Sequence, residues 1–176
     1  MRALLLTLTA LLLATQAHAF EPNVNDEMEL NVAQAILAIK RADPGIEAFF
    51  ENAAGYAVFP GVGKGGLVVG GAYGKGLVIV DEKVDGYTTM TQASIGLQIG
   101  GQKYAQFIFF KDDVAIGHFR RGNFEFGAQA SAVAITAGAS ADASYDGGVA
   151  VFTHAAGGLM VEGSVGGQKF TYEPKK

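Results

Sequence analysis

The stretch NAAGYAVFPGVGKGGLVVGGAYGKGLVIV, residues 52–80, decides the fold of this chain. Short β-branched or aromatic runs alternate there with glycines at nearly every break, and a helix does not tolerate this, because each interior glycine costs about 0.5–1 kcal/mol relative to alanine. Antiparallel strands do tolerate it, since glycine serves turns, bulges and close backbone approach. The stretch predicts a β-meander of strands Tyr56–Phe59, Leu67–Val69 and Leu77–Val80, with Lys64 and Lys75 in its glycine-rich breaks.

The flanking segments predict an α+β fold that is mainly antiparallel β. Asp26 is the expected N-cap of a helix over 26–41, with Glu29 completing a capping-box pattern, and Pro44 starts a second, short helix. Asp112 is expected to cap a third helix over 113–121. We expect further strands at 87–91, 94–101, 104–110, 124–126, 149–153, 159–165 and 169–172 in a glycine-rich sandwich or barrel-like sheet. Residues 127–144 are small and predict closely packed strands or a flexible linker.

The first 19 residues have the pattern of a secretory signal peptide. Arg2 precedes an apolar run over 3–14, and Ala17-His18-Ala19 is a small-residue cleavage signal, so we expect cleavage after Ala19. The run is shorter than the about 20 residues that span a bilayer. This predicts a periplasmic or secreted protein with one domain over 20–176. No cysteine is present to be lipidated at the cleavage point.

Charge and cysteine content exclude several classes of protein. Cleavage would remove Arg2, so that 12 basic residues face 17 acidic ones and the net charge becomes −5. We therefore expect no nucleic-acid partner. The absence of cysteine excludes a disulfide framework and a thiolate metal site.

Motifs of enzymes and nucleotide-binding proteins are incomplete in this chain. Residues 61–66, GVGKGG, match G-x-G-x-x-G, but a further β run follows where a dinucleotide site needs a helix N-terminus. His118 and His154 lack metal-binding spacing, and no serine lies in G-x-S-x-G. We therefore expect no enzymatic activity, no catalytic residue, no metal and no cofactor.

Basic residues near the glycine-rich breaks are the candidate binding residues. A repeat, Gly-Gly-Gln-Lys-aromatic, occurs at 100–104 and again at 166–170. It predicts either a repeated hairpin or bulge, or a similar presentation of its two lysines. A local cationic face would attract anionic lipid headgroups by about 1 kcal/mol per basic residue. The lipid-binding residues expected on electrostatic grounds are Lys64, Lys75, Lys103, Arg120, Arg121 and Lys169.

Four segments together resemble the SYLF lipid-binding domain. They are FFENAAGYAVFP followed by GKGG at 49–66, IGLQIGGQ at 95–102, the expected helix at 115–119, and the glycine-bounded segment 157–163. The resemblance covers nearly all of residues 20–176. It implies a compact antiparallel fold without enzymatic activity; eukaryotic relatives bind phosphoinositides and, in fungi, actin. Actin binding is not carried over to a chain that is expected to be exported.

The sequence thus favours an exported, non-enzymatic module that contacts anionic phospholipid through a basic face. A first alternative is an envelope structural or interaction module that binds a protein partner without lipid. A second is an outer-membrane β-barrel, although two expected helices precede the strands and the chain ends without a terminal aromatic residue. An enzyme would need a pocket that gathers a histidine with a carboxylate.

Overall fold

The computed structural model describes residues 19–66, 69–95, 102–127, 130–155 and 163–176. Nearly all of the expected signal peptide and parts of the expected strands at 67–69, 94–101 and 159–165 lie outside these residues. The helical elements are α1 (Glu27–Ala42), η1 (Pro44–Ile46), α2 (Glu47–Asn52), α3 (Asp113–Phe119) and η2 (Ala139–Asp142). The strands are β1 (Gly55–Gly66), β2 (Val69–Val80), β3 (Lys83–Ile95), β4 (Gln102–Phe110), β5 (Ser131–Ala134), β6 (Val149–Ala155), β7 (Gly163–Ser164) and β8 (Lys169–Pro174).

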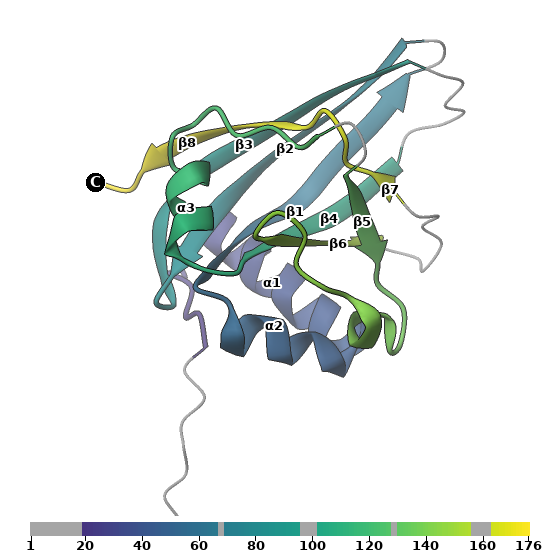
Figure 1. Ribbon diagram of the computed structural model, residues 1–176. Coiled ribbons are helices and arrows are strands. Elements are labelled where there is room, and N and C mark those ends of the chain that lie inside the picture. Colours follow the sequence, from purple (N-terminus) through teal and green to yellow (C-terminus); the bar gives the residue numbers. More distant parts are fainter. Residues whose placement is uncertain (1–18, 67–68, 96–101, 128–129, 156–162) are drawn as a thin grey trace, which may run out of the picture.

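The strands form one curved open sheet in the order β7-β5-β6-β4-β1-β2-β3-β8. All pairs are antiparallel except β5 with β6. The helices α1 and α2 lie along one face of the sheet, and α3 lies on the other (Figure 1). The α+β class with two N-terminal helices and a short internal helix is therefore confirmed.

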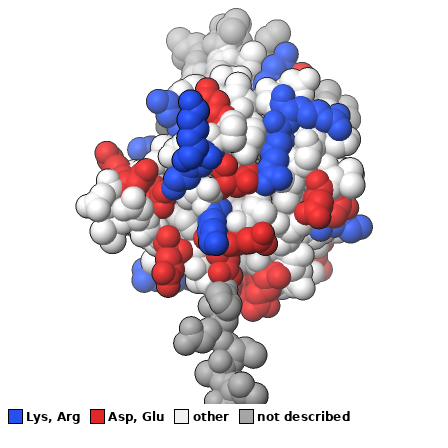
Figure 2. Space-filling model, turned by 90° about the vertical axis from the view of Figure 1, so that its left-hand side faces the viewer, with Lys and Arg blue, Asp and Glu red and all other residues white. Residues whose placement is uncertain are grey.

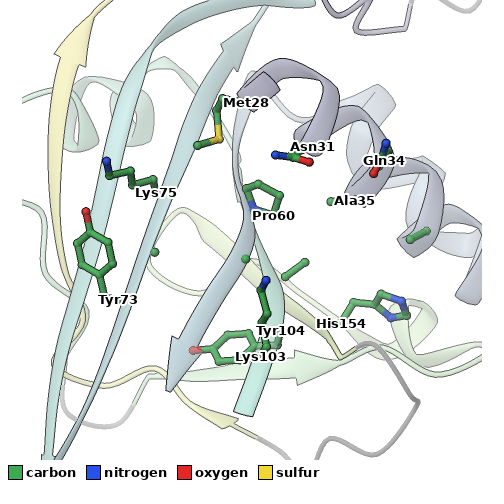
Figure 3. A pocket seen from close by; sticks show the side chains of 14 residues that line it. Met28, Asn31, Gln34, Ala35, Pro60, Tyr73, Lys75, Lys103, Tyr104 and His154 are labelled. Carbon is green, nitrogen blue, oxygen red and sulfur yellow. The ribbon is translucent and has the colours of Figure 1, made fainter. Parts of the chain in front are cut away.

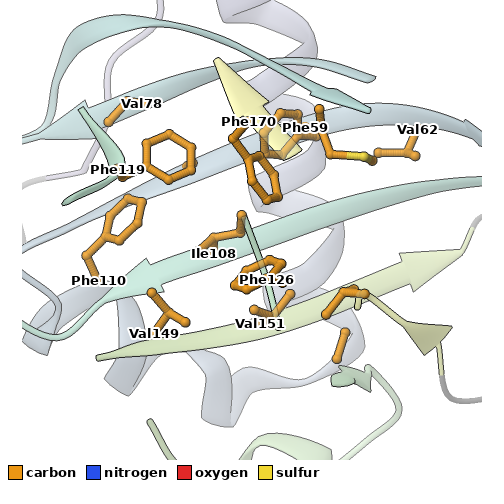
Figure 4. Close-up of a cluster of buried hydrophobic side chains, with 14 of the residues drawn as sticks. Phe59, Val62, Val78, Ile108, Phe110, Phe119, Phe126, Val149, Val151 and Phe170 are labelled. Carbon is orange, nitrogen blue, oxygen red and sulfur yellow. The ribbon is translucent and has the colours of Figure 1, made fainter. Parts of the chain in front are cut away.

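The sheet separates two layers of buried side chains. Alternate residues of a strand point to opposite faces, so on β4 Phe107 and Phe109 pack toward α1 and α2, while Ile108 and Phe110 pack toward α3. In the second layer the ring of Phe170 of β8 contacts those of Phe59, Phe119 and Phe126 (Figure 4). It also contacts the ring of Phe124.

The glycine-rich stretch forms longer strands than the sequence predicted. The described parts of the expected runs lie within β1 and β2, which continue through the glycines, so Lys64 and Lys75 lie within strands and the expectation that they sit in turns is wrong. Paired neighbours supply the ladder hydrogen bonds, and these outweigh the low strand propensity of single glycines. Within 127–144, the described part contains the short strand β5 but also the helical turn η2.

Helix capping follows the sequence only in part. The Asp26 side chain accepts hydrogen bonds from the backbone N–H groups of Met28 and Glu29, as an N-cap does. Glu29 does not complete the capping box. Its side chain is 4% exposed, and its two oxygens accept hydrogen bonds from the Asn23 N–H and from Lys175 Nζ, both at 2.8 Å. Lys175 of the C-terminal tail thus binds the Glu29 carboxylate, which the sequence predicted to cap the start of α1.

Asp43 joins the helical layer to the segment before β6. Its carboxylate is almost fully buried and accepts hydrogen bonds from the N–H groups of Gly45 (3.0 Å) and Ser140 (2.7 Å). Burial alone would raise the pKa of Asp43, but these hydrogen bonds outweigh it and hold the pKa below its usual value.

We expect Asp43→Asn to lower the free energy of unfolding at neutral pH by about 1–3 kcal/mol, because hydrogen bonds to a charged group are replaced by weaker ones. A carboxyl whose folded-state pKa is depressed stabilises the fold above its unfolded pKa of about 3.9, and this contribution is lost as pH falls through the folded-state value. Urea unfolding from pH 2 to 7 should therefore show a smaller acid destabilisation in the variant. The exposed Asp113→Asn is the control; an equal effect of both variants would contradict this role.

Candidate functional site

A groove of about 640 Å³ lies between α1 and strands β1, β2, β4 and β6. One wall is the face of α1 with Met28, Asn31, Gln34, Ala35 and Ala38. The floor and the other wall come from the sheet, and the side chains of α1, β2, β4 and β6 approach this groove in Figure 3. The sheet residues that line it are Pro60, Gly61, Tyr73, Gly74, Lys75, Lys103, Tyr104, Ala105 and His154.

A β-bulge in β1 shapes the floor of the groove. The pairing of β1 shifts register around Pro60 with both neighbouring strands. Proline lacks an N–H and is therefore tolerated at such an irregularity. Beyond the bulge, Gly61 pairs with Lys75 of β2 and Gly63 pairs with Lys103 of β4. The two lysines thus flank β1 from opposite sides, next to Gly61 and Gly63, while the intervening Val62 packs into the core layer toward α3.

The glycine floor lets one lysine cross the strand. A Cβ built on Gly61 would lie 3.3 Å from Cε of Lys103, so the stem of Lys103 lies over Gly61. Lys75 and Lys103 are exposed, and His154 is half-buried at the β6 side. Burial raises the pKa of Tyr104 to about 12, so this phenol stays neutral at physiological pH.

The groove combines positive charge with apolar surface. None of its 14 described lining residues is Asp or Glu, although the whole chain is acidic. Its charged groups are therefore the two lysines, beside the apolar surface of Met28, Pro60 and the half-exposed Tyr73. Such a site suits a ligand with an anionic group and an apolar part.

The other four expected cations lie elsewhere. Lys64 is half-buried and is paired in register with Ala72, whose side chain belongs to the core layer toward α3. Lys169 on β8 lies 3.6 Å from Glu125. It is absent from the groove lining, so the two lysines of the Gly-Gly-Gln-Lys repeat have different surroundings.

Arg120 is engaged in an ion pair, while its neighbour Arg121 is exposed. The Arg120 guanidinium donates two hydrogen bonds to Asp85, one of 2.8 Å from Nε, and Tyr172 donates a third at 2.7 Å. The hydrogen bonds with Asp85 raise the pKa of Arg120, whereas Asp85, despite its partial burial, has a lowered pKa. On the side of the molecule with α3 and the C-terminus, Lys and Arg alternate with Asp and Glu (Figure 2). The six cations therefore do not form one continuous face.

The sequence did not predict that α1 lies beside Lys75, Lys103 and His154. Strand alternation could have shown that Lys103 shares a face with Ala105, Phe107 and Phe109. The groove itself was not predictable, because α1 lies far from these residues in the sequence. A buried pair, Gln106 and Gln168, was also not predicted from the sequence. Their side-chain amides form two hydrogen bonds with each other, of 2.7 and 3.1 Å.

Within the described part of the chain, no group of three or more His, Cys, Asp or Glu residues is arranged to hold a metal ion. In the same residues, no helix combines the length and the apolar character needed to cross a membrane.

Comparison with known proteins assigns the family. Residues 91–175 match the family Ysc84, described as Las17-binding protein actin regulator. The chain is also similar to "Beta cell expansion factor A" of Aeromonas veronii, with 30% identity over 138 residues that make up 77% of this chain. Residues 91–175 belong to the SYLF (Ysc84) family.

This confirms the resemblance seen in the sequence. SYLF is not a known enzyme family. The chain spans about half of the length of the Aeromonas relative, 52%. Of the groove, Lys103 and His154 lie within the matched range 91–175, whereas α1 and Lys75 precede it.

Proposed function

We propose that this SYLF protein is an exported, non-enzymatic lipid-binding module that contacts anionic phospholipid through the groove between α1 and the sheet. The observation that carries the proposal is the pair Lys75 and Lys103, exposed together over glycines in a groove whose described lining holds no carboxylate. Membership of the family supports a lipid ligand. Export rests on the signal-peptide pattern of residues 1–19.

The charged and the apolar residues of the groove would contact different parts of the phospholipid. The two lysine ammonium groups can meet a phosphate, and each is worth about 1 kcal/mol near an anionic surface. Met28, Pro60 and Tyr73 can contact glycerol and the upper acyl chain. The phospholipid is then bound without bond breaking, and the protein serves adhesion or presentation at a membrane surface. Actin regulation, which the family description names, is not proposed for an exported chain.

Sedimentation of residues 20–176 with vesicles tests this function. We expect binding about thirtyfold tighter to phosphatidylglycerol vesicles than to phosphatidylcholine vesicles, since two lysines contribute about 2 kcal/mol. Raising the ionic strength toward about 1 M, where the Debye length falls to about 3 Å, should abolish most of this preference. Equal binding to both vesicles, or binding to neither, would argue against the proposal and favour a protein partner in the envelope.

A further inference from the structure

A second hollow, of about 530 Å³, lies on another side of α1 and is lined by the first residues of the described chain. Ala19 and Phe20 both line it, so the peptide bond that joins them lies at the hollow. The Phe20 side chain packs against the core layer shared by α1, α2 and the sheet. This is the bond at which the sequence predicts cleavage of the signal peptide.

The hollow is rich in carboxylates. Glu47 and Glu51 reach it from α2, and Glu82 reaches it from the turn between β2 and β3. Lys40 of α1 is the basic residue among the described lining residues, and its Nζ is bonded to Glu47 at 2.8 Å. Glu51 and Glu82 form no salt bridge within the described part of the chain.

A hydroxyl without a hydrogen-bond partner also lines the hollow. Tyr56 of β1 lines it and is 8% exposed, yet its hydroxyl forms no hydrogen bond with any described residue. Burial, together with the charges of Glu82 and Glu47, raises the pKa of Tyr56, so that its oxygen is a neutral acceptor. A hydroxyl oxygen without a partner, beside two carboxylates that form no salt bridge, can accept a hydrogen bond from a cationic donor.

We propose that this hollow binds the chain's own new N-terminus, the ammonium group of Phe20, once the signal peptide has been removed. Hydrolysis by a signal peptidase adds one water across the bond, leaving a carboxylate on Ala19 and an amine on Phe20 that takes up a proton. Glu51, Glu82 and the Tyr56 hydroxyl receive this ammonium, while the Phe20 ring stays packed on the core. Before cleavage the same nitrogen is an uncharged amide, so processing itself creates the contact.

The surrounding charges set the direction of the pH dependence. The groups that face the new ammonium are Glu47 and Glu51 on α2, Glu82 in the turn, Lys40 on α1, and the adjacent Glu21. Three lining carboxylates against one lysine favour the protonated amine, so its pKa in the folded protein lies above the ordinary value of about 7.7–8.0. The stabilisation is therefore complete below that value and is lost as pH rises through the folded-state pKa.

The test titrates the Phe20 α-amino group by NMR in residues 20–176, which include all of the described helices and strands. We expect a pKa at least about half a unit above 7.7–8.0. Glu51→Gln with Glu82→Gln should return it to the ordinary range, whereas the exposed Glu173→Gln should not. A chain with Gly-Ser before Phe20 should melt at a lower temperature than the processed chain below pH 8, and the difference should vanish at high pH.

An ordinary pKa in the unmodified chain overturns the proposal, and so does a raised pKa that the two glutamines leave unchanged. If the double variant does not fold, the titration of the unmodified chain and the Gly-Ser comparison decide by themselves. Mass spectrometry of the exported protein must show Phe20 as the first residue; another N-terminus refutes the proposal. None of these results depends on lipid binding, so failure of the vesicle test and failure of this one are distinguishable.

Discussion

Gly76→Ala is expected to lower the free energy of unfolding by about 3 kcal/mol or more. A Cβ at residue 76 would lie 2.3 Å from the carbonyl oxygen of Val58 and 2.8 Å from a ring carbon of Phe59. The first of these atoms belongs to the backbone of β1 at the bulge, so it cannot turn away as a flexible side chain can. Overpacking in such places costs about 1–3 kcal/mol and sometimes more.

Gly63→Ala is the matched control, because it changes the same residue type within β1. A Cβ at residue 63 meets nothing within 4 Å. The control should leave stability unchanged or raise it by up to about 1 kcal/mol, since alanine restricts the unfolded chain. Urea unfolding of both variants measures the difference. Equal stability of Gly76→Ala and Gly63→Ala would show that β1 and β2 approach less closely than the structure has them.

These two glycines show what the sequence could and could not predict. Glycine density excluded helix correctly from the described residues of 55–80, because that cost is local to each residue. Strand length was not predictable in the same way, because it depends on the partner strand. Val58 and Gly76 are 18 residues apart, and only the pairing of β1 with β2 shows that one of them requires the other to lack a side chain.

The starts of α1 and α3 were predictable, because their capping contacts are also local in sequence. Asp26 and Asp112 accept hydrogen bonds from backbone N–H groups two or three residues further on, and such contacts can be seen in a short window of sequence. Glu29 was not predictable, because its partner Lys175 lies 146 residues away. A local capping pattern was overridden by a contact between the ends of the chain.

The candidate site was also predictable only in part. Lys75 and Lys103 were expected on electrostatic grounds, and the structure places them in one groove. Arg120 was expected to belong with them, but Asp85 holds it at another place in the fold, 35 residues back along the chain. Charge type can be counted from a sequence, whereas the neighbours that neutralise a charge depend on the topology of the sheet.

Reversal of the two groove lysines is the second large effect that we expect. Lys75→Glu with Lys103→Glu removes two attractive charges from the groove and adds two repulsive ones, a change of about 4 kcal/mol for contact with an anionic surface. Both side chains are exposed, so the double variant should fold and unfold as the unmodified protein does. Affinity for phosphatidylglycerol vesicles should fall at least about a hundredfold.

A second double variant separates the groove from the net charge of the protein. Lys111 and Arg121 are exposed, form no salt bridge within the described residues, and do not line the groove. Lys111→Glu with Arg121→Glu therefore changes the net charge equally at another place. Circular dichroism should show that both double variants keep the fold.

The decisive measurement is vesicle affinity of the two double variants side by side, at one ionic strength and one lipid composition. If anionic phospholipid is held in the groove beside α1, the Lys75 and Lys103 variant loses its affinity, while the Lys111 and Arg121 variant keeps most of it. Equal losses, or a larger loss in the Lys111 and Arg121 variant, would contradict the assignment of the groove as the binding site.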